Sequence, residues 1–196
     1  MMRDKVKTLV VEDDIDFAFL IRDLIMHDER LLFLGHAATR RDAIGMAAGL
    51  KPDVVLMDLS LSICEYDGIA AARDIRVATG AKILLVTSFE QHDIVINASK
   101  RAFASGYVFK SDYRDLADTI YMTATSITPQ ECFIRELLLG ELSPAERSVF
   151  EGIIAGDCSS QTASSLKTIA NQKTSIFKKL GVKSTNELET VFSLGR

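Results

Sequence analysis

The sequence has no long apolar run. No stretch approaches the roughly 20 apolar residues with which a helix crosses a bilayer. The first residues, MMRDKVK, lead directly into a predicted strand and contain no apolar core of the kind that a secretory signal needs. We therefore expect a soluble, cytoplasmic protein with no membrane partner.

Cysteine is also scarce. The three cysteines, Cys64, Cys132 and Cys158, lie far apart, and no two of them form a Cys-x-x-Cys pair. This odd number and wide spacing favour neither a disulfide framework nor a zinc site. Ordinary reduced thiols are therefore expected.

The chain as a whole lacks an excess of basic charge. Its formal net charge is −4 over 196 residues, and only residues 142–196 are slightly basic, with seven basic and five acidic side chains. So small an excess is weak evidence for nucleic-acid binding. With 47% hydrophobic residues, the chain can bury the core of one or two domains.

Short apolar runs are present instead, and several of them end in residues that can do chemistry. In the central stretch DVVLMDLSLS, four apolar residues precede Asp58. Such a run is typical of a strand that is buried on both faces of a parallel sheet. Polar residues follow three other predicted strands: Glu12, Asp13 and Asp14 after Val6 to Val11, Thr87 and Ser88 after Ile83 to Val86, and Lys110 after Val108 and Phe109.

These residue types suit phosphoryl transfer to a carboxylate. Clustered acids repel one another and are stable only beside a cation, and carboxylate oxygens are the ligands that Mg²⁺ prefers. In this interpretation Asp58 is the nucleophile, Lys110 is a second counter-charge, and the Thr87 hydroxyl donates to a phosphate oxygen. The alternative for a single Asp after a strand is that it caps a turn or a helix.

The order of elements predicts the fold class, an α/β protein with a doubly wound, five-stranded parallel sheet. Five predicted strands alternate with helices and short loops. In the flavodoxin-like order 2-1-3-4-5, the first strand lies beside the third, which brings Glu12 and Asp13 to Asp58. The predicted strands are Lys5–Glu12, Leu31–Gly35, the run before Asp58, Lys82–Thr87 and Tyr107–Phe109, and the helices include Ala43–Leu50, Ile69–Ala78, His92–Phe103 and 112–126, the last with Asp112 as its N-cap.

Four motifs in this order, VVEDD, LMDL, VTS and FK, resemble the receiver domain of two-component response regulators over about residues 5–125. The resemblance implies that Asp58 accepts a phosphoryl group from a histidine kinase and that Thr87, Tyr107 and Lys110 respond to it. It also implies a Mg²⁺ site formed by Glu12, Asp13, Asp58 and the Ser60 backbone carbonyl.

The loop after Asp58 departs from the receiver pattern. Receivers usually have a proline four residues after the acceptor and a glycine eight residues after it, whereas here Ser62 takes the place of the proline and Gly68 comes ten residues after. The loop 60–67 is therefore two residues longer. We expect the chemistry to be retained, with altered kinetics or kinase pairing.

The C-terminal region predicts a second, all-α domain. Pro129 begins a linker helix that runs to Leu139, and Ser143-Pro144-Ala145-Glu146 is typical of a helix start. The motifs LSPAERSVF, KTI and IFKKLGVKS resemble the four-helix DNA-binding domain of LuxR-type regulators. The expected domains are a receiver (1–125), a linker helix (126–141) and a LuxR-type helix-turn-helix domain (142–196).

This second resemblance is incomplete at the helix-turn-helix. About four residues of the usual turn are missing, so residues 160–179 can form one bent helix. The candidate DNA contacts are Lys167, Asn171, Lys173 and Thr174. The alternative is a packed helix whose lysines are only solvated. We expect binding to promoter DNA that is weak and strongly dependent on salt.

Together these features predict a response regulator in which phosphorylation of Asp58 controls homodimerisation or docking of a DNA-binding domain, without an external enzymatic substrate. Three alternative functions share some of these features. A phosphatase of the haloacid dehalogenase type needs a second acid where this chain has Ser60. A flavin-binding module needs a neutral phosphate loop where this chain has Glu12 to Asp14. The third is an output domain that binds protein and no longer binds DNA specifically.

Overall fold

The computed structural model describes residues 4–61, 67–156 and 166–193. The chain divides into two compact units, Met1–Ile134 and Arg135–Arg196. Each unit is described by itself. Within the described residues, no helix combines the length and the apolar character that crossing a membrane would require.

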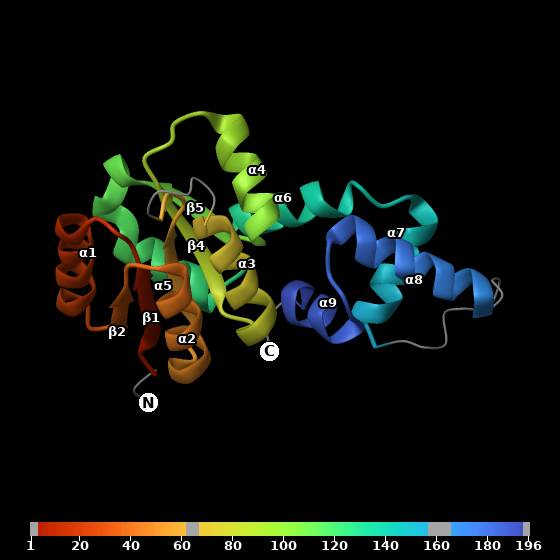
Figure 1. The fold of residues 1–196 in the computed structure, drawn as a ribbon, viewed down its shortest axis with the longest axis horizontal. Coiled ribbons are helices and arrows are strands. Elements are labelled where there is room, and N and C mark those ends of the chain that lie inside the picture. The colour runs from red at the N-terminus through yellow and green to blue at the C-terminus, as the bar shows by residue number, and fades with distance from the viewer. Residues whose placement is uncertain (1–3, 62–66, 157–165, 194–196) are drawn as a thin grey trace. The chain divides into compact units, whose positions relative to one another are not determined.

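The first unit contains the expected parallel sheet. Its strand order is β2-β1-β3-β4-β5, and every neighbouring pair is parallel. The predicted fold class is thereby confirmed (Figure 1). The strands are β1 (Val6–Val11), β2 (Leu31–Ala37), β3 (Val54–Asp58), β4 (Lys82–Thr87) and β5 (Gly106–Phe109).

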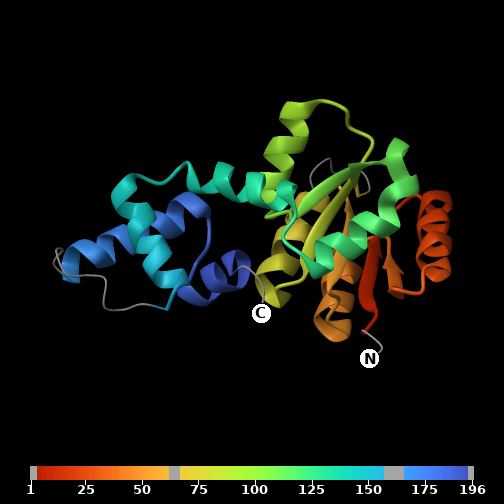
Figure 2. The same cartoon turned by 180° about the vertical axis from the view of Figure 1, so that it is seen from behind.

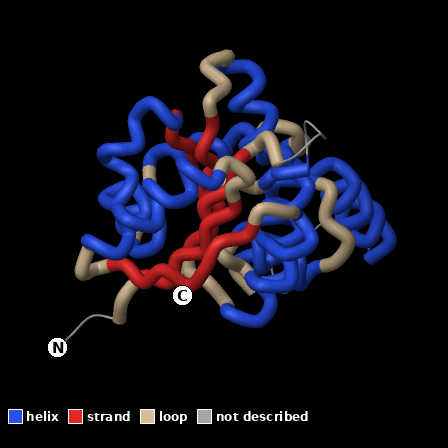
Figure 3. The backbone as a smooth tube through the Cα atoms, turned by 60° about the vertical axis from the view of Figure 1, so that its left-hand side comes forward, coloured by secondary structure: helices blue, strands red, loops and turns tan. Residues whose placement is uncertain are grey.

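Helices cover both faces of this sheet because parallel strands need crossover connections. Figure 1 shows α2 and α3 in front of the sheet, and Figure 2 shows α5 over the opposite face. The same layering of helices around the strands is visible in Figure 3. The helices are α1 (Ile15–His27), α2 (Arg40–Leu50), α3 (Asp67–Thr79), α4 (His92–Ala102) and α5 (Leu116–Thr125).

The sequence prediction was wrong at the start of α5. Asp112 does not cap the helix: it has φ −102° and ψ 23° inside a 3₁₀ helix, η1 (Lys110–Asp115), and α5 begins only at Leu116. The chain turns tightly on leaving β5, and a 3₁₀ turn makes that reversal in fewer residues than an α-helical turn. Lys110 is the first residue of this turn.

The second unit is helical in its described part. The predicted linker helix is present as α6 (Pro129–Leu139), and the division between the units falls inside it. It is followed by α7 (Pro144–Ile154), α8 (Leu166–Leu180) and α9 (Thr185–Phe192). The predictions for the segment 160–165 and for the shortened turn lie outside the described residues, as do Ser62, Cys64 and Cys158. Cys132 is a free, exposed thiol.

Glu146 ties the start of α7 to α8. Its carboxylate accepts hydrogen bonds from the Ser143 N–H (2.7 Å), the Ser175 hydroxyl (2.6 Å) and the Lys179 ammonium (2.6 Å). The Ser143 hydroxyl in turn accepts the Glu146 N–H, which completes a capping box at the predicted helix start. Lys179, then Ser175, then the Ser143 N–H lower the pKa of Glu146 to about 2.

This arrangement predicts acid sensitivity in the second unit. Because the folded pKa of Glu146 is below its usual 4.5, the ionised carboxylate stabilises the fold above pH 4.5 and loses this effect as pH falls toward 2. We expect Glu146→Gln to destabilise the unit at pH 7 and to remove this part of its pH dependence. Urea unfolding followed by far-ultraviolet circular dichroism at pH 7 and pH 3.5 measures both effects.

The matched control is Glu189→Gln, which changes an exposed carboxylate on α9 of the same unit. It should behave as the unmodified chain does at both pH values. Equal pH dependence in Glu146→Gln and the unmodified chain would contradict the proposed role of Glu146.

Candidate functional site

The carboxylates that the sequence singled out come together at the carboxyl edge of the sheet. Glu12 directly follows β1, Asp58 ends β3, and Val11 pairs with Met57 in the parallel ladder between them. Glu12 is 1% exposed and Asp58 6% exposed, whereas Asp13 is exposed. Oxygen atoms of these three carboxylates lie within 4.8 Å of one another.

Lys110 supplies the positive charge in this cluster. Its ammonium lies 2.7 Å from Glu12 Oε2 and 3.0 Å from Asp58 Oδ2. The same ammonium lies 4.7 Å from the centre of the Phe17 ring, close enough for a cation–π contact. Because η1 begins at Lys110, directly after β5, the ammonium lies between the two buried carboxylates. This position agrees with the predicted role of Lys110 as a counter-charge.

The electrostatics of the site show how costly the cluster is without a cation. Burial, with a smaller contribution from the charge of Asp58, raises the pKa of Glu12 to about 7 against the opposing effect of Lys110. Burial by itself lowers the pKa of Lys110, but its hydrogen bond to Glu12 and the charge of Asp58 outweigh this, so the pKa lies above its usual value. Each acid therefore depends on a nearby positive charge.

The donor set fits a Mg²⁺ ion. Mg²⁺ prefers carboxylate oxygens and keeps several waters in an octahedral shell. Glu12 and Asp58 offer buried oxygens, and exposed Asp13 leaves room for water. The Ser60 N–H donates to Asp58 Oδ1 (3.2 Å), so this peptide lies against the site. Coordination by the Ser60 carbonyl remains a prediction.

The two predicted switch residues lie on β4 and β5. Thr87 is completely buried and follows Val86, which pairs with Asp58 in the sheet. Its hydroxyl oxygen accepts the N–H of Phe89 (3.0 Å), which leaves the hydroxyl hydrogen available for another acceptor. Tyr107 is half-buried, and its ring contacts the edge of Phe109 at a centre-to-centre distance of 5.7 Å.

Sequence reasoning missed two residues that shape this region. Gly68, noted only for its spacing, packs directly on the backbone of Asp58 and Leu59. Gln130, in the first turn of α6, accepts the N–H of Tyr107 through its side-chain oxygen (3.0 Å). A glycine in the first turn of a helix could have indicated the close packing of Gly68 on the strand. Nothing in the sequence indicates the hydrogen bond between Gln130 and Tyr107.

The start of α6 is held to the sheet by further contacts within the first unit. Glu131 forms an ion pair of 2.7 Å with Lys82 at the start of β4, and Thr128 donates to the Ser105 carbonyl (3.4 Å). Since Gln130 binds the backbone of Tyr107 between these contacts, the linker helix begins directly beside a predicted switch residue.

The candidate DNA contacts lie on α8, as far as they are described. Asn171 and Thr174 are exposed, and Lys173 is half-buried. The Thr174 hydroxyl donates to the Ala170 carbonyl (3.0 Å) in the same helix. The side chain of Lys167 lies outside the described residues. Their role in DNA binding remains a prediction.

Comparison with known proteins shows the family. Residues 8–121 match the family described as the response regulator receiver domain. The chain therefore belongs to the response regulator receiver family, and the first of the two predicted resemblances is confirmed.

Curated proteins of two kinds are similar to this chain. The chain is 36% identical over 88 residues to a protein-glutamate methylesterase/protein-glutamine glutaminase of Vibrio parahaemolyticus, covering 45% of this chain and 23% of the relative. It is 24% identical over 206 residues to the transcriptional regulatory protein YdfI of Bacillus subtilis, covering 94% of each chain. The chain thus spans 23% of this methylesterase, 21% of the one from Photobacterium profundum, and nearly all of YdfI.

Solved structures agree on the fold. The RcsB response regulator of Salmonella typhimurium aligns over 95% of this chain and 96% of its own, with a TM-score of 0.57 and 22% identity. A LuxR-family two-component response regulator from Aurantimonas aligns over 68% of this chain and 98% of its own, with a TM-score of 0.54 and 26% identity. The chain is thus a receiver-domain protein with relatives among transcriptional regulators.

Proposed function

We propose that this chain is a response regulator in which Asp58 accepts a phosphoryl group from a sensor histidine kinase and thereby controls a DNA-binding C-terminal unit. The observation that carries the proposal is the cluster of Glu12, Asp13, Asp58 and Lys110, in which a buried carboxylate stands beside a candidate metal site and a fixed ammonium. The proposal includes a cytoplasmic location and no catalysis on an external substrate.

The chemistry assigned to the residues is an in-line displacement at phosphorus. An oxygen of Asp58 attacks the phosphorus of a phosphohistidine, the new P–O bond forms as the P–N bond breaks, and the leaving imidazole takes up a proton. Lys110 and the Thr87 hydroxyl stabilise the charge on the phosphoryl oxygens. Mg²⁺ bound by Glu12, Asp13 and Asp58, with the Ser60 carbonyl as a further ligand, would neutralise charge on the incoming group.

The test is labelling with a small acyl phosphate and Mg²⁺, read by intact-protein mass. The unmodified chain should gain one phosphoryl group, and Asp58→Asn should gain none. The control is Asp23→Asn on α1, where an exposed carboxylate pairs with His27 and should not affect labelling. Labelling of Asp58→Asn at the rate of the unmodified chain would reject Asp58 as the acceptor.

We further propose that phosphorylation promotes a homodimer. A helix-turn-helix that reads a two-fold site needs two copies, and one unit with so few basic residues has little affinity alone. Sedimentation of the labelled and unlabelled chain, with Asp58→Asn as a control, measures the change. A monomer in both states would favour relief of docking between the units as the mechanism of control.

For the output, we expect weak DNA binding with a steep dependence on salt and low sequence preference. The candidate contacts on α8 are the exposed, uncharged Asn171 and Thr174 and the half-buried Lys173. Most of the binding free energy would therefore come from lysine–phosphate contacts, which carry no sequence information and are weakened by salt. Fluorescence anisotropy with promoter fragments at two salt concentrations measures affinity and slope. We expect Lys173→Ala to lower the magnitude of the salt slope by about 1.

Asn171→Ala separates the two candidate outputs. If one promoter is bound tightly at physiological salt and this variant loses the preference, α8 works as a recognition helix and the expectation of weak binding is wrong. If no fragment is preferred, the second candidate gains support: a phosphorylation-controlled module that binds protein. The uncharged exposed residues of α8 favour that alternative.

A further inference from the structure

A closed set of contacts links Phe17 to the reacting groups. The Lys110 ammonium lies 4.7 Å from the centre of the Phe17 ring on α1. The same ammonium donates to Glu12 Oε1 (2.8 Å) and to Asp58 Oδ2 (3.0 Å). The N–H of Asp14 donates to Glu12 Oε1 (3.3 Å), and the Asp14 carboxylate accepts the N–H of Phe17 (3.2 Å). The contacts therefore run from the ring through the ammonium and the buried acid back to the backbone of Phe17.

The local structure places this ring beside the ammonium. Asp14 is the N-cap of α1, so the helix begins directly after the acids and Phe17 lies in its first turn. Tyr113 follows Lys110 by three residues in η1, the spacing at which side chains of a 3₁₀ turn point the same way. Its ring meets the Phe17 ring at an angle of 78°, with 6.5 Å between the ring centres. Contacts from α1 and η1 thus fix the ring at this place.

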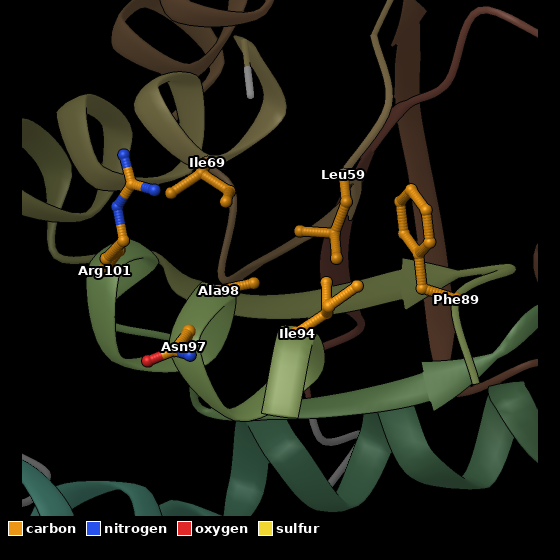
Figure 4. A pocket seen from close by; sticks show the side chains of 7 residues that line it. All are labelled: Leu59, Ile69, Phe89, Ile94, Asn97, Ala98 and Arg101. Carbon is orange, nitrogen blue, oxygen red and sulfur yellow. The ribbon is translucent and has the colours of Figure 1, made fainter. Parts of the chain in front are cut away.

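Apolar side chains limit the access of water to these groups. Met57 and Leu59 flank Asp58 in the chain and are 0% and 2% exposed. Leu59 points into a pocket of about 320 Å³ between α3 and α4 (Figure 4), which is also lined by Ile69, Ala98 and, at one end, Arg101. The Lys110 side chain is itself only 18% exposed. Because a cation is attracted more strongly to a ring face where water is excluded, the Phe17 contact contributes more here than at the surface.

The ring differs from the other neighbours of the ammonium. Glu12 and Asp58 are candidate ligands of Mg²⁺, and an ion bound there would take negative charge away from Lys110. The face of an aromatic ring attracts a cation through its quadrupole and is not one of the oxygen ligands that Mg²⁺ prefers. A lysine ammonium has three N–H donors, so it can turn one toward a phosphoryl oxygen while it stays over the ring.

We propose that Phe17 is a positioning residue, whose ring holds the Lys110 ammonium at the acceptor and thereby sets the rate at which Asp58 is phosphorylated. The effect on the rate rests on the proposed function, whereas the contact between ring and ammonium does not. Phe17 also packs against the hydrophobic core of the first unit. The experiments therefore measure the contact and the rate separately, on the full chain, and distinguish both from a loss of packing.

The contact is measured by NMR of the chain with isotope-labelled lysine, in metal-free buffer. The Lys110 signal is identified by its absence in Lys110→Met. Protons over the face of an aromatic ring are shielded, so we expect the ε protons of Lys110 to lie upfield of those of the other lysines. Phe17→Leu should remove this shift, and Phe17→Tyr, which keeps the ring, should retain it. An unshifted Lys110 signal, or a shift that persists in Phe17→Leu, would overturn the contact.

The rate is measured by labelling with a small acyl phosphate at saturating Mg²⁺. We expect Phe17→Leu to slow labelling about threefold to tenfold, because a cation–π contact that is partly removed from water contributes on the order of such a factor. Phe17→Tyr should label as the unmodified chain does. The matched control is Phe33→Leu, since Phe33 is another half-buried ring on the same core and the cation over it is Arg22. This variant should lose stability and keep the unmodified rate.

A series of fluorinated side chains separates the charge effect from the shape of the ring. Mono-, di- and trifluorinated phenylalanine in place of Phe17 closely keep the size of the ring but draw electron density from its face, which weakens its attraction for a cation. Labelling should slow with each added fluorine. Equal rates across the series, in a chain that is labelled at Asp58, would reject the positioning role. If the unmodified chain is not labelled at all, the proposed function fails together with the effect on the rate, and the chemical shift still decides the contact.

Discussion

Replacing Gly68 with alanine is expected to lower the free energy of unfolding of the first unit by about 1–3 kcal/mol, or more, and to slow the phosphorylation of Asp58. A Cβ atom at this position would overlap the carbonyl oxygen of Asp58 and lie 2.8 Å from that of Leu59. Both obstacles are backbone atoms next to the acceptor, so no side chain can rotate away. Either α3 moves outward or the end of β3 is displaced.

Gly45→Ala on α2 is the matched control. A Cβ atom there meets nothing within 4 Å, and alanine in a helix is about 0.5–1 kcal/mol more favourable than glycine. The chain has no tryptophan, and its four tyrosines, residues 66, 107, 113 and 121, all belong to the first unit. Urea unfolding followed by tyrosine fluorescence therefore reports on this unit alone. Unchanged stability and labelling in Gly68→Ala would contradict the close packing described above.

Replacing Lys110 with methionine is expected to destabilise the first unit in metal-free buffer by about 2 kcal/mol. Removing one partner of a buried ion pair typically costs about 3–5 kcal/mol. We expect less here because Glu12, whose pKa is already raised to about 7, relieves part of the cost by taking up a proton. Methionine is an unbranched apolar side chain that is one heavy atom shorter than lysine, and it removes the ammonium together with its contact with the Phe17 ring.

The same change should increase the stabilisation that Mg²⁺ provides. Without the ammonium, the carboxylates of Glu12 and Asp58 are more negative toward a cation, and tighter binding to the folded state raises stability further. Tyrosine fluorescence during urea unfolding, with and without Mg²⁺, measures this. Lys7→Met, an exposed position on β1, is the control and should respond to Mg²⁺ as the unmodified chain does. If Lys110→Met and Lys7→Met respond alike, Lys110 is not the charge that balances the acids.

The core of the site could be predicted from the sequence because it depends on short-range rules. An apolar run followed by a polar residue places that residue at the carboxyl end of a buried strand, and parallel strands bring those ends to one edge. Glu12 and Lys110 are 98 residues apart in the sequence, and this rule places both beside Asp58.

Other features depended on contacts that no local pattern encodes. The prediction that Asp112 caps a helix followed from residue preference, but the chain forms a 3₁₀ turn there as it leaves β5. The hydrogen bond from the Tyr107 N–H to Gln130 joins β5 to a helix residue 23 positions later in the chain. Nothing in the sequence shows that β5 is an edge strand or that Gln130 is the acceptor for its N–H.

The sequence by itself determined the fold class and the acid cluster, because hydrophobic periodicity and strand order leave few topologies open to a chain of alternating strands and helices. Only the tertiary structure decided how closely Gly68 packs on Asp58, how Glu146 joins two helices, and that Leu59, Ile69 and Ala98 enclose a space with Arg101 at one end. These are matters of distance between segments remote in the chain, and side-chain packing sets such distances only after the elements have assembled.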